Sequence, residues 1–141
     1  MNVGDATLTG LATARTGSTA GHPAPNAPEA STFDLILHAA AGSALGGSGT
    51  PYTLTISAID LTCVTQGWPT LTLHQSFDVA SGWIPCGTGQ GYQCTQTLPV
   101  PVPGGGPGGP LAGHTLQCVA SLISRGASIV SIIHSNPFVL V

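Results

Sequence analysis

YTLTISA, residues 52–58, is the stretch that decides the fold, because its apolar and hydroxyl side chains alternate without interruption. A period of two is typical of a β-strand with one buried face and one exposed face. After this stretch the alternation changes phase, since Ile59, Leu61 and Cys63 carry it on. Such a one-residue slip turns side chains to the other face unless the backbone bulges, so we expect a bulge or bend at residues 58–60.

Further short alternating or β-prone stretches are spread along the rest of the chain, and no window has the spacing of an amphipathic helix. Alternating or apolar runs occupy residues 33–39, 71–77, 116–122, 129–133 and 138–141, and a short strand is expected at 83–84. Strands of this length and spacing predict an all-β fold, an antiparallel β-sandwich of about seven or eight strands with long glycine- and proline-rich loops. A small barrel is the alternative architecture.

The chain of 141 residues has the length of one ordinary domain. We divide it into an extended N-terminal arm or linker at residues 1–31 and a β-sandwich domain at residues 32–141. The arm ends in a proline-rich stretch at residues 15–31. The run at residues 97–114 is rich in proline and glycine, which excludes a central strand and indicates a long loop or an extended edge.

A short β-prone segment in the arm is a candidate for assembly. Its apolar residues are Ala6, Leu8 and Leu11. A strand on a proline-rich tether can add to the sheet of a neighbouring subunit and so satisfy an open edge. The alternative is that this strand pairs within its own domain.

The chain carries very little charge. Only 5% of the residues are Asp, Glu, Lys or Arg, against about 25% in a typical soluble domain. The net charge of −3, with two basic residues, Arg15 and Arg125, gives no basic patch and excludes nucleic acid as a partner. Weak repulsion between copies favours self-association. No segment approaches 18 consecutive apolar residues, so we expect no membrane-spanning segment.

The four cysteines predict two disulfide bonds. Cys86 and Cys94 bracket a glycine-rich loop, which a local bridge would close, and Cys63 and Cys118 lie on the apolar sides of their predicted strands. The intervening lengths do not fit the close ligand pairs of structural zinc sites, so we expect no metal and no other cofactor. Disulfide bonds indicate export, so we expect a secreted protein at the cell surface or outside the cell.

The even number of cysteines and the Ser/Thr-rich strands resemble immunoglobulin-like sandwiches in architecture. The resemblance implies a fold and no functional residues. It departs from the family pattern at Leu116, where a tyrosine would be expected before the second core cysteine, and at Trp68, which lies in a Gly-Trp-Pro turn.

No catalytic motif is present, and we expect a protein that is not an enzyme. His38, His74 and His134 are expected to face solvent, and Asp34, Asp60 and Asp78 are expected to make turn or backbone hydrogen bonds near strand ends. The leading hypothesis is an extracellular structural subunit of a surface assembly or filament, which self-associates through its N-terminal strand and an uncharged surface. The alternative is a carbohydrate-binding module whose loop aromatics stack on sugar rings. These are Trp68, Trp83 and Tyr92.

Overall fold

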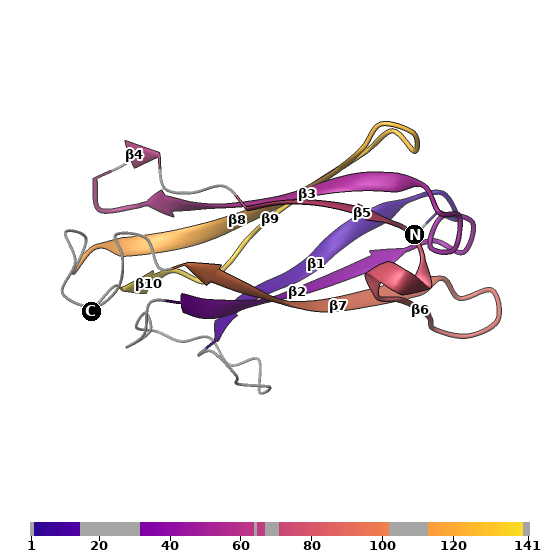
Figure 1. Ribbon diagram of the computed structural model, residues 1–141, viewed down its shortest axis with the longest axis horizontal. Coiled ribbons are helices and arrows are strands. Elements are labelled where there is room, and N and C mark those ends of the chain that lie inside the picture. Colours follow the sequence, from indigo (N-terminus) through magenta and orange to yellow (C-terminus); the bar gives the residue numbers. More distant parts are fainter. Residues whose placement is uncertain (1, 15–31, 64, 67–70, 102–112, 140–141) are drawn as a thin grey trace.

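The computed structural model describes residues 2–14, 32–63, 65–66, 71–101 and 113–139, which form two layers of strands (Figure 1). One short 3₁₀ helix, η1, occupies Val79–Ser81. The strands are β1 (Ala6–Ala14), β2 (Thr32–Ala41), β3 (Pro51–Asp60), β4 (Thr65–Gln66), β5 (Leu71–Ser76), β6 (Trp83–Pro85), β7 (Tyr92–Pro101), β8 (Thr115–Ser124), β9 (Ile129–His134) and β10 (Phe138–Val139). Across these residues, no helix has the length and hydropathy needed to cross a bilayer.

Both sheets are antiparallel, and they pack face to face as a sandwich. The first, sheet A, has the order β1-β2-β7-β6. The second, sheet B, has the order β10-β8-β3-β4, with β5 also paired to β3 and β9 also paired to β8. The prediction of an antiparallel β-sandwich is confirmed. The strand count exceeds the expected seven or eight because the N-terminal segment and two-residue strands also pair.

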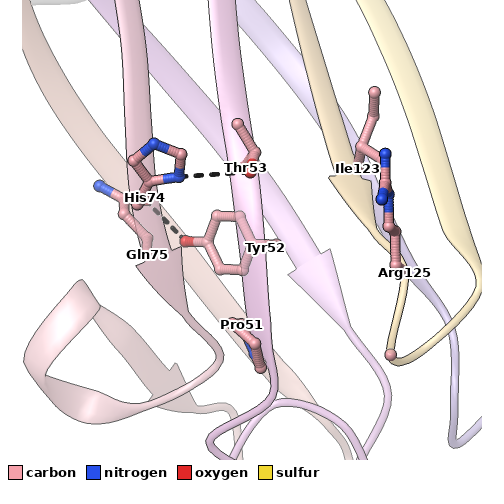
Figure 2. A pocket seen from close by; sticks show the side chains of 8 residues that line it. Pro51, Tyr52, Thr53, His74, Gln75, Ile123 and Arg125 are labelled. Atoms are coloured by element: carbon pink, nitrogen blue, oxygen red, sulfur yellow. Dashed lines mark hydrogen bonds between the residues drawn. The ribbon is translucent and has the colours of Figure 1, made fainter.

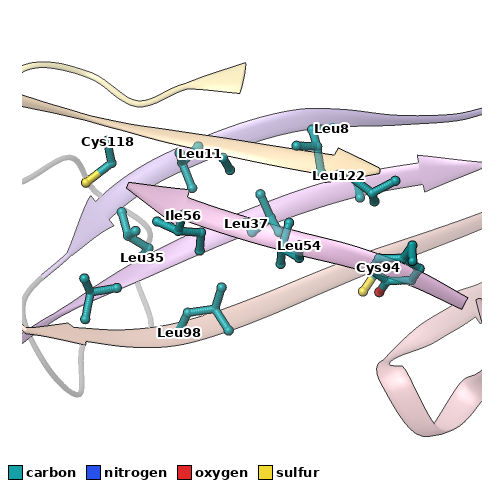
Figure 3. Close-up of a cluster of buried hydrophobic side chains, with 14 of the residues drawn as sticks. Leu8, Leu11, Leu35, Leu37, Leu54, Ile56, Cys94, Leu98, Cys118 and Leu122 are labelled. Carbon is teal, nitrogen blue, oxygen red and sulfur yellow. The ribbon is translucent and has the colours of Figure 1, made fainter. Parts of the chain in front are cut away.

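The core lies between the two sheets and is built from the inward positions of the alternating strands (Figure 3). Leu54 and Ile56 of β3 are 1% and 2% exposed, and Leu35 of β2 is fully buried. The alternation in β3 continues in one phase to its last residue, and its register with β8 runs without a shift from Thr53 to Asp60. The predicted bulge at residues 58–60 is therefore wrong.

One end of the sandwich is closed by three aromatic rings. The ring of Phe77 lies 4.6 Å from that of Tyr52 and 5.1 Å from that of Trp83, measured between centroids. The indole Nε1 of Trp83 donates a hydrogen bond of 3.1 Å to the Tyr52 hydroxyl, which itself donates one of 2.7 Å to Gln75 Oε1. The polar tips of these rings thus have partners inside the protein, as buried Tyr and Trp usually require.

The N-terminal segment is a strand of the sandwich. In the structure β1 pairs with β2 of the same chain, with a register shift between Leu8 and Gly10, and it buries Leu8, Leu11 and Ala14. The backbone N–H of Leu8 also donates to Ser131 Oγ of β9 at 2.9 Å, which ties the edge of sheet A to sheet B. The described part of the predicted arm therefore contributes to the core, while residues 15–31 lie outside the described residues.

The proline- and glycine-rich run at residues 97–114 begins as an extended edge, which was one of its two predicted forms. Strand β7 continues to Pro101 and pairs along its whole length with β2, whereas β6 pairs only with Tyr92–Cys94. Beyond Cys94, no other described strand pairs with that side of β7. The remainder of the run, residues 102–112, lies outside the described residues.

Neither predicted disulfide bond forms, and each predicted pair joins an exposed cysteine to a buried one. All four cysteines are free. Cys118 is buried on β8 opposite Ala58, five residues from Cys63, which is exposed in the turn after β3. Cys94 is buried opposite Trp83, and Cys86 is exposed beyond the end of β6.

Candidate functional site

The outer face of sheet B carries mostly hydroxyl and aliphatic side chains. Ile123 of β8 lies opposite Val130 of β9, and Ser121 lies opposite Ile132. Ile123 is 43% exposed, Val130 69% and Ile132 61%. The outward positions of β3, such as Thr53, continue this surface toward β5. We call these outward positions of β5, β3, β8 and β9 the outer face.

Formal charge is absent from the outer face. The outward positions of these four strands, all of which the structure describes, contain no Asp, Glu, Lys or Arg. His74 and His134 are exposed there, as predicted, while His38 is exposed on sheet A. The three histidines lie on separate strands of both sheets, so they do not form the three-histidine cluster that their number could suggest.

A groove of about 460 Å³ opens at the corner of the outer face, beside the turn between β8 and β9 (Figure 2). Its polar lining comes from Thr53, His74, Gln75 and Arg125. Thr53 Oγ1 and His74 Nδ1 lie 3.5 Å apart across the β3–β5 pair. Ile123 forms the apolar wall on the opposite side, so the groove joins the aliphatic part of the outer face to hydrogen-bonding groups.

The two predicted sugar-stacking aromatics that the structure describes, Trp83 and Tyr92, do not form an exposed platform. Trp83 is 1% exposed and belongs to the aromatic cluster at the end of the core, so it cannot stack on a ligand without unfolding that end. Tyr92 is partly buried, and its ring covers Gly46 and Gly47. Trp68 lies outside the described residues. The buried position of Trp83 corrects its assignment as a ligand-stacking residue.

A second group of functional side chains meets where β3 ends and β8 begins. His114 Nδ1 lies 2.7 Å from Asp60 Oδ2 and 4.0 Å from Cys63 Sγ. Asp60 is 1% exposed, the His114 side chain is 25% exposed, and Cys63 is exposed. Sequence reasoning missed this group, because it assigned Cys63 to the core and considered His114 only as part of a loop.

The local fold explains why Asp60 is buried. Its Oδ1 accepts hydrogen bonds from the backbone N–H groups of Thr62 at 2.9 Å and Cys63 at 3.3 Å, which shapes the turn after β3. The hydrogen bond to His114, followed by these two backbone bonds, lowers the pKa of the Asp60 carboxyl against the opposing effect of burial. The turn is fastened to β8, because the Thr115 N–H donates to Thr62 Oγ1 at 2.8 Å.

The aspartates near strand ends make turn contacts, as predicted for Asp60 and Asp78. Asp78 Oδ1 accepts a hydrogen bond of 2.9 Å from the Ser81 N–H and so caps η1. Asp78 follows the strand paired to the start of β3, while Asp60 is the last residue of β3, so the two carboxylates lie at opposite ends of sheet B. They do not form an acid–base pair. Asp34 is buried on β2.

Comparison with known proteins gives a likeness of fold only. The sequence matches no protein-family model and no curated protein. Among solved structures, the chain is similar to the β-glucuronidase of Bifidobacterium dentium, whose structure was determined in complex with coumarin-3-O-glucuronide. The identity is 15% and the TM-score 0.44, over 96% of this chain and 18% of that chain. Because this chain spans less than a fifth of that enzyme, the likeness supports neither an activity nor a substrate.

Proposed function

We propose that this protein is a non-enzymatic structural subunit that self-associates through the outer face of sheet B. The observation that carries the proposal is the exposure of Ile123, Val130 and Ile132 side by side on a sheet face without formal charge. Scattered single apolar residues are normal on a protein surface, but a contiguous group marks a site of interaction.

The partner that fits this face is a second copy of the chain. A charged protein surface would lose hydration of its charges here without gaining an ionic partner, which costs free energy. A second outer face brings no charges to desolvate, and its hydroxyl groups can both donate and accept hydrogen bonds. The net charge of −3 on 141 residues adds little repulsion between copies.

The size of the outer face limits the area that one contact can bury. Strands β3 and β8 have 10 residues each, and β5 and β9 have 6 each. With about 3.3 Å per residue and about 4.8 Å between strands, the face covers roughly 500 Å² per copy. A standard interface buries about 800 Å² per partner. We therefore expect weak, concentration-dependent association that becomes stable through several contacts per subunit.

The side of β7 with which no described strand pairs beyond Cys94 is less suited to assembly. Pro99 and Pro101 lie at alternate positions of β7, and proline has no N–H to give to an added strand. Prolines on an edge strand are a recognised protection against strand addition. The N-terminal strand is the other expected contact, and its exchange between copies would repeat the β1–β2 pairing seen within one chain. Exchange through β1 is therefore the rival mode of self-association.

Sedimentation velocity over a concentration series tests the proposal. Ile132→Lys places a charge in the middle of the outer face, at a side chain 61% exposed, and should shift the protein to monomer. Ile84→Lys is the matched control, because Ile84 is 58% exposed but lies on β6 of sheet A. Equal association of both variants and the wild type would refute the proposal, as would a wild type that stays monomeric.

Carbohydrate binding is the second candidate, and the groove beside the outer face is the observation that favours it. Thr53, His74, Gln75 and Arg125 offer hydrogen-bonding groups to a small polar ligand. Arg125→Ala should then abolish binding in a glycan screen without changing sedimentation. Trp83→Ala is not a test of this candidate, because Trp83 is buried and its loss would destabilise the core.

An extracellular location is part of the proposal, but the disulfide bonds from which it was inferred are absent from the structure. Export was inferred from disulfide bonds, and the four thiols are free. Thiol titration of the native protein purified from its source decides the point, because a reduced protein would favour an intracellular assembly.

A further inference from the structure

We infer that Asp60, Cys63 and His114 form a binding site for a divalent transition metal of intermediate softness, with Zn²⁺ as the preferred ion. One carboxylate oxygen, one sulfur and one imidazole nitrogen all lie within 4.8 Å of one another. These three ligand types are the ones that zinc takes in proteins. The site lies at the end of β3 and the start of β8, away from the exposed aliphatic group on β8 and β9, and it is independent of the proposed self-association.

The two distances from His114 fit a zinc ion after a small movement of its ring. Zinc lies about 2.0–2.2 Å from nitrogen and oxygen ligands and about 2.3 Å from sulfur, so tetrahedral angles separate N from O by about 3.4 Å and N from S by about 3.6 Å. The observed separations are 2.7 Å from Nδ1 to Asp60 Oδ2 and 4.0 Å from Nδ1 to Cys63 Sγ. Moving the imidazole by less than about 1 Å, away from Asp60 and toward Cys63, satisfies both.

The protein already orients the carboxylate for this role. Asp60 uses Oδ1 to accept the two backbone hydrogen bonds of its turn, which leaves Oδ2 directed at His114. Hydrogen bonds that fix a ligand in this way are a regular feature of metal sites. Asp60 is buried, while Cys63 is exposed and His114 is partly exposed, so an ion can enter from solvent.

The same geometry argues against a catalytic cysteine. In nucleophilic catalysis the thiol and the carboxylate engage opposite nitrogens of the histidine, so that the ring transfers a proton between them. Here both groups face Nδ1. A nitrogen, an oxygen and a sulfur that lie within 4.8 Å of one another can instead bind one shared cation. Among the described residues this is the one group of three or more such side chains.

Cobalt titration of the full-length protein tests the inference. With the thiols kept reduced by a phosphine, Co²⁺ should bind one to one and give the absorption of a thiolate–Co²⁺ charge-transfer transition, and Zn²⁺ should displace it. Cys63→Ser should remove this absorption and weaken Zn²⁺ binding by more than about tenfold. Removing a group that only hydrogen-bonds to a metal ligand already weakens binding by about 10–100-fold, so removing a ligand should cost at least as much. Cys86→Ser is the matched control, because Cys86 is also exposed but lies near β6.

Two results would overturn the inference. One is the absence of one-to-one Co²⁺ binding to the wild type, and the other is a charge-transfer band that survives in Cys63→Ser. Because Cys63 is exposed, the serine variant should keep the wild-type circular dichroism spectrum. His114→Gln provides a second variant that leaves the Asp60 turn bonds in place and should also weaken Zn²⁺ binding by more than about tenfold.

Discussion

The buried thiol of Cys118 should make the protein lose stability in alkaline solution. Burial, partly offset by a hydrogen bond with Ser135, raises the pKa of this thiol from its ordinary 9.0 to about 12. Above pH 9 the unfolded chain ionises the thiol while the folded chain keeps it neutral, so ionisation lowers the free energy of the unfolded state and the free energy of unfolding decreases. The stability is fully present below pH 9 and falls as the pH rises toward 12.

The size of the loss follows from the shift. Each pH unit between 9 and 12 costs about 1.4 kcal/mol for one group, so at pH 11 Cys118 lowers the free energy of unfolding by about 3 kcal/mol. The Tyr52 hydroxyl adds to the loss, because burial raises its pKa from 10.0 to about 12. Small domains unfold with only about 5–15 kcal/mol, so the loss is a large fraction of the total.

Urea unfolding followed by circular dichroism at pH 8 and pH 11 measures this loss under reducing conditions. Between the two pH values the free energy of unfolding of the wild type should fall by about 3 kcal/mol more than that of Cys118→Ala, which lacks the thiol. The small cavity left by the missing sulfur lowers the stability of Cys118→Ala at both pH values, so it cancels when the change between pH 8 and pH 11 is compared. Cys86→Ala, at an exposed thiol, should behave like the wild type. Equal losses in the wild type and Cys118→Ala would refute the reasoning.

Three further predictions concern packing. A thiol reagent should modify two cysteines in the native protein and four after unfolding, and modification of none would restore the disulfide prediction. Trp83→Ala should lower the free energy of unfolding by about 3–5 kcal/mol in a thermal or urea melt, and a smaller effect would show that its ring is not buried. Gly46→Ala places a Cβ against Tyr92 and should cost about 1–3 kcal/mol, measured as a lower Tm. The expected fast thiols are Cys63 and Cys86, and the protected ones are Cys94 and Cys118.

Alternation was enough to predict the sandwich, because a two-sided strand must bury one face against another layer. Residues 52–58 became β3, the strand that pairs with β8 on one side and β5 on the other. The same reasoning failed after Ala58. It followed hydrophobicity to Ile59 and Cys63, whereas Asp60 is buried because two backbone N–H groups and His114 satisfy its carboxylate. Local hydrogen bonds of this kind cannot be predicted from a hydrophobic pattern.

The site at Asp60 could not be predicted from spacing, because its residues are far apart in sequence. Cys63 and His114 are separated by 51 positions and meet only because β3 and β8 pair in the register that sets Asp60 opposite Leu116. Trp83 shows the converse error. Its place next to a loop suggested exposure, but the indole turns inward to Tyr52 and Phe77. Register and side-chain direction are therefore the information that the sequence lacked.

Methyl NMR over a dilution series tests the central claim, self-association through the outer face, most directly. As the protein is concentrated, the methyl signals of Ile123, Val130 and Ile132 should shift together, while that of Ile84 on the other sheet should stay constant. Signals that do not change with concentration would contradict the claim. Changes confined to Leu8 and Leu11 would contradict it as well, because they would assign the association to exchange of β1.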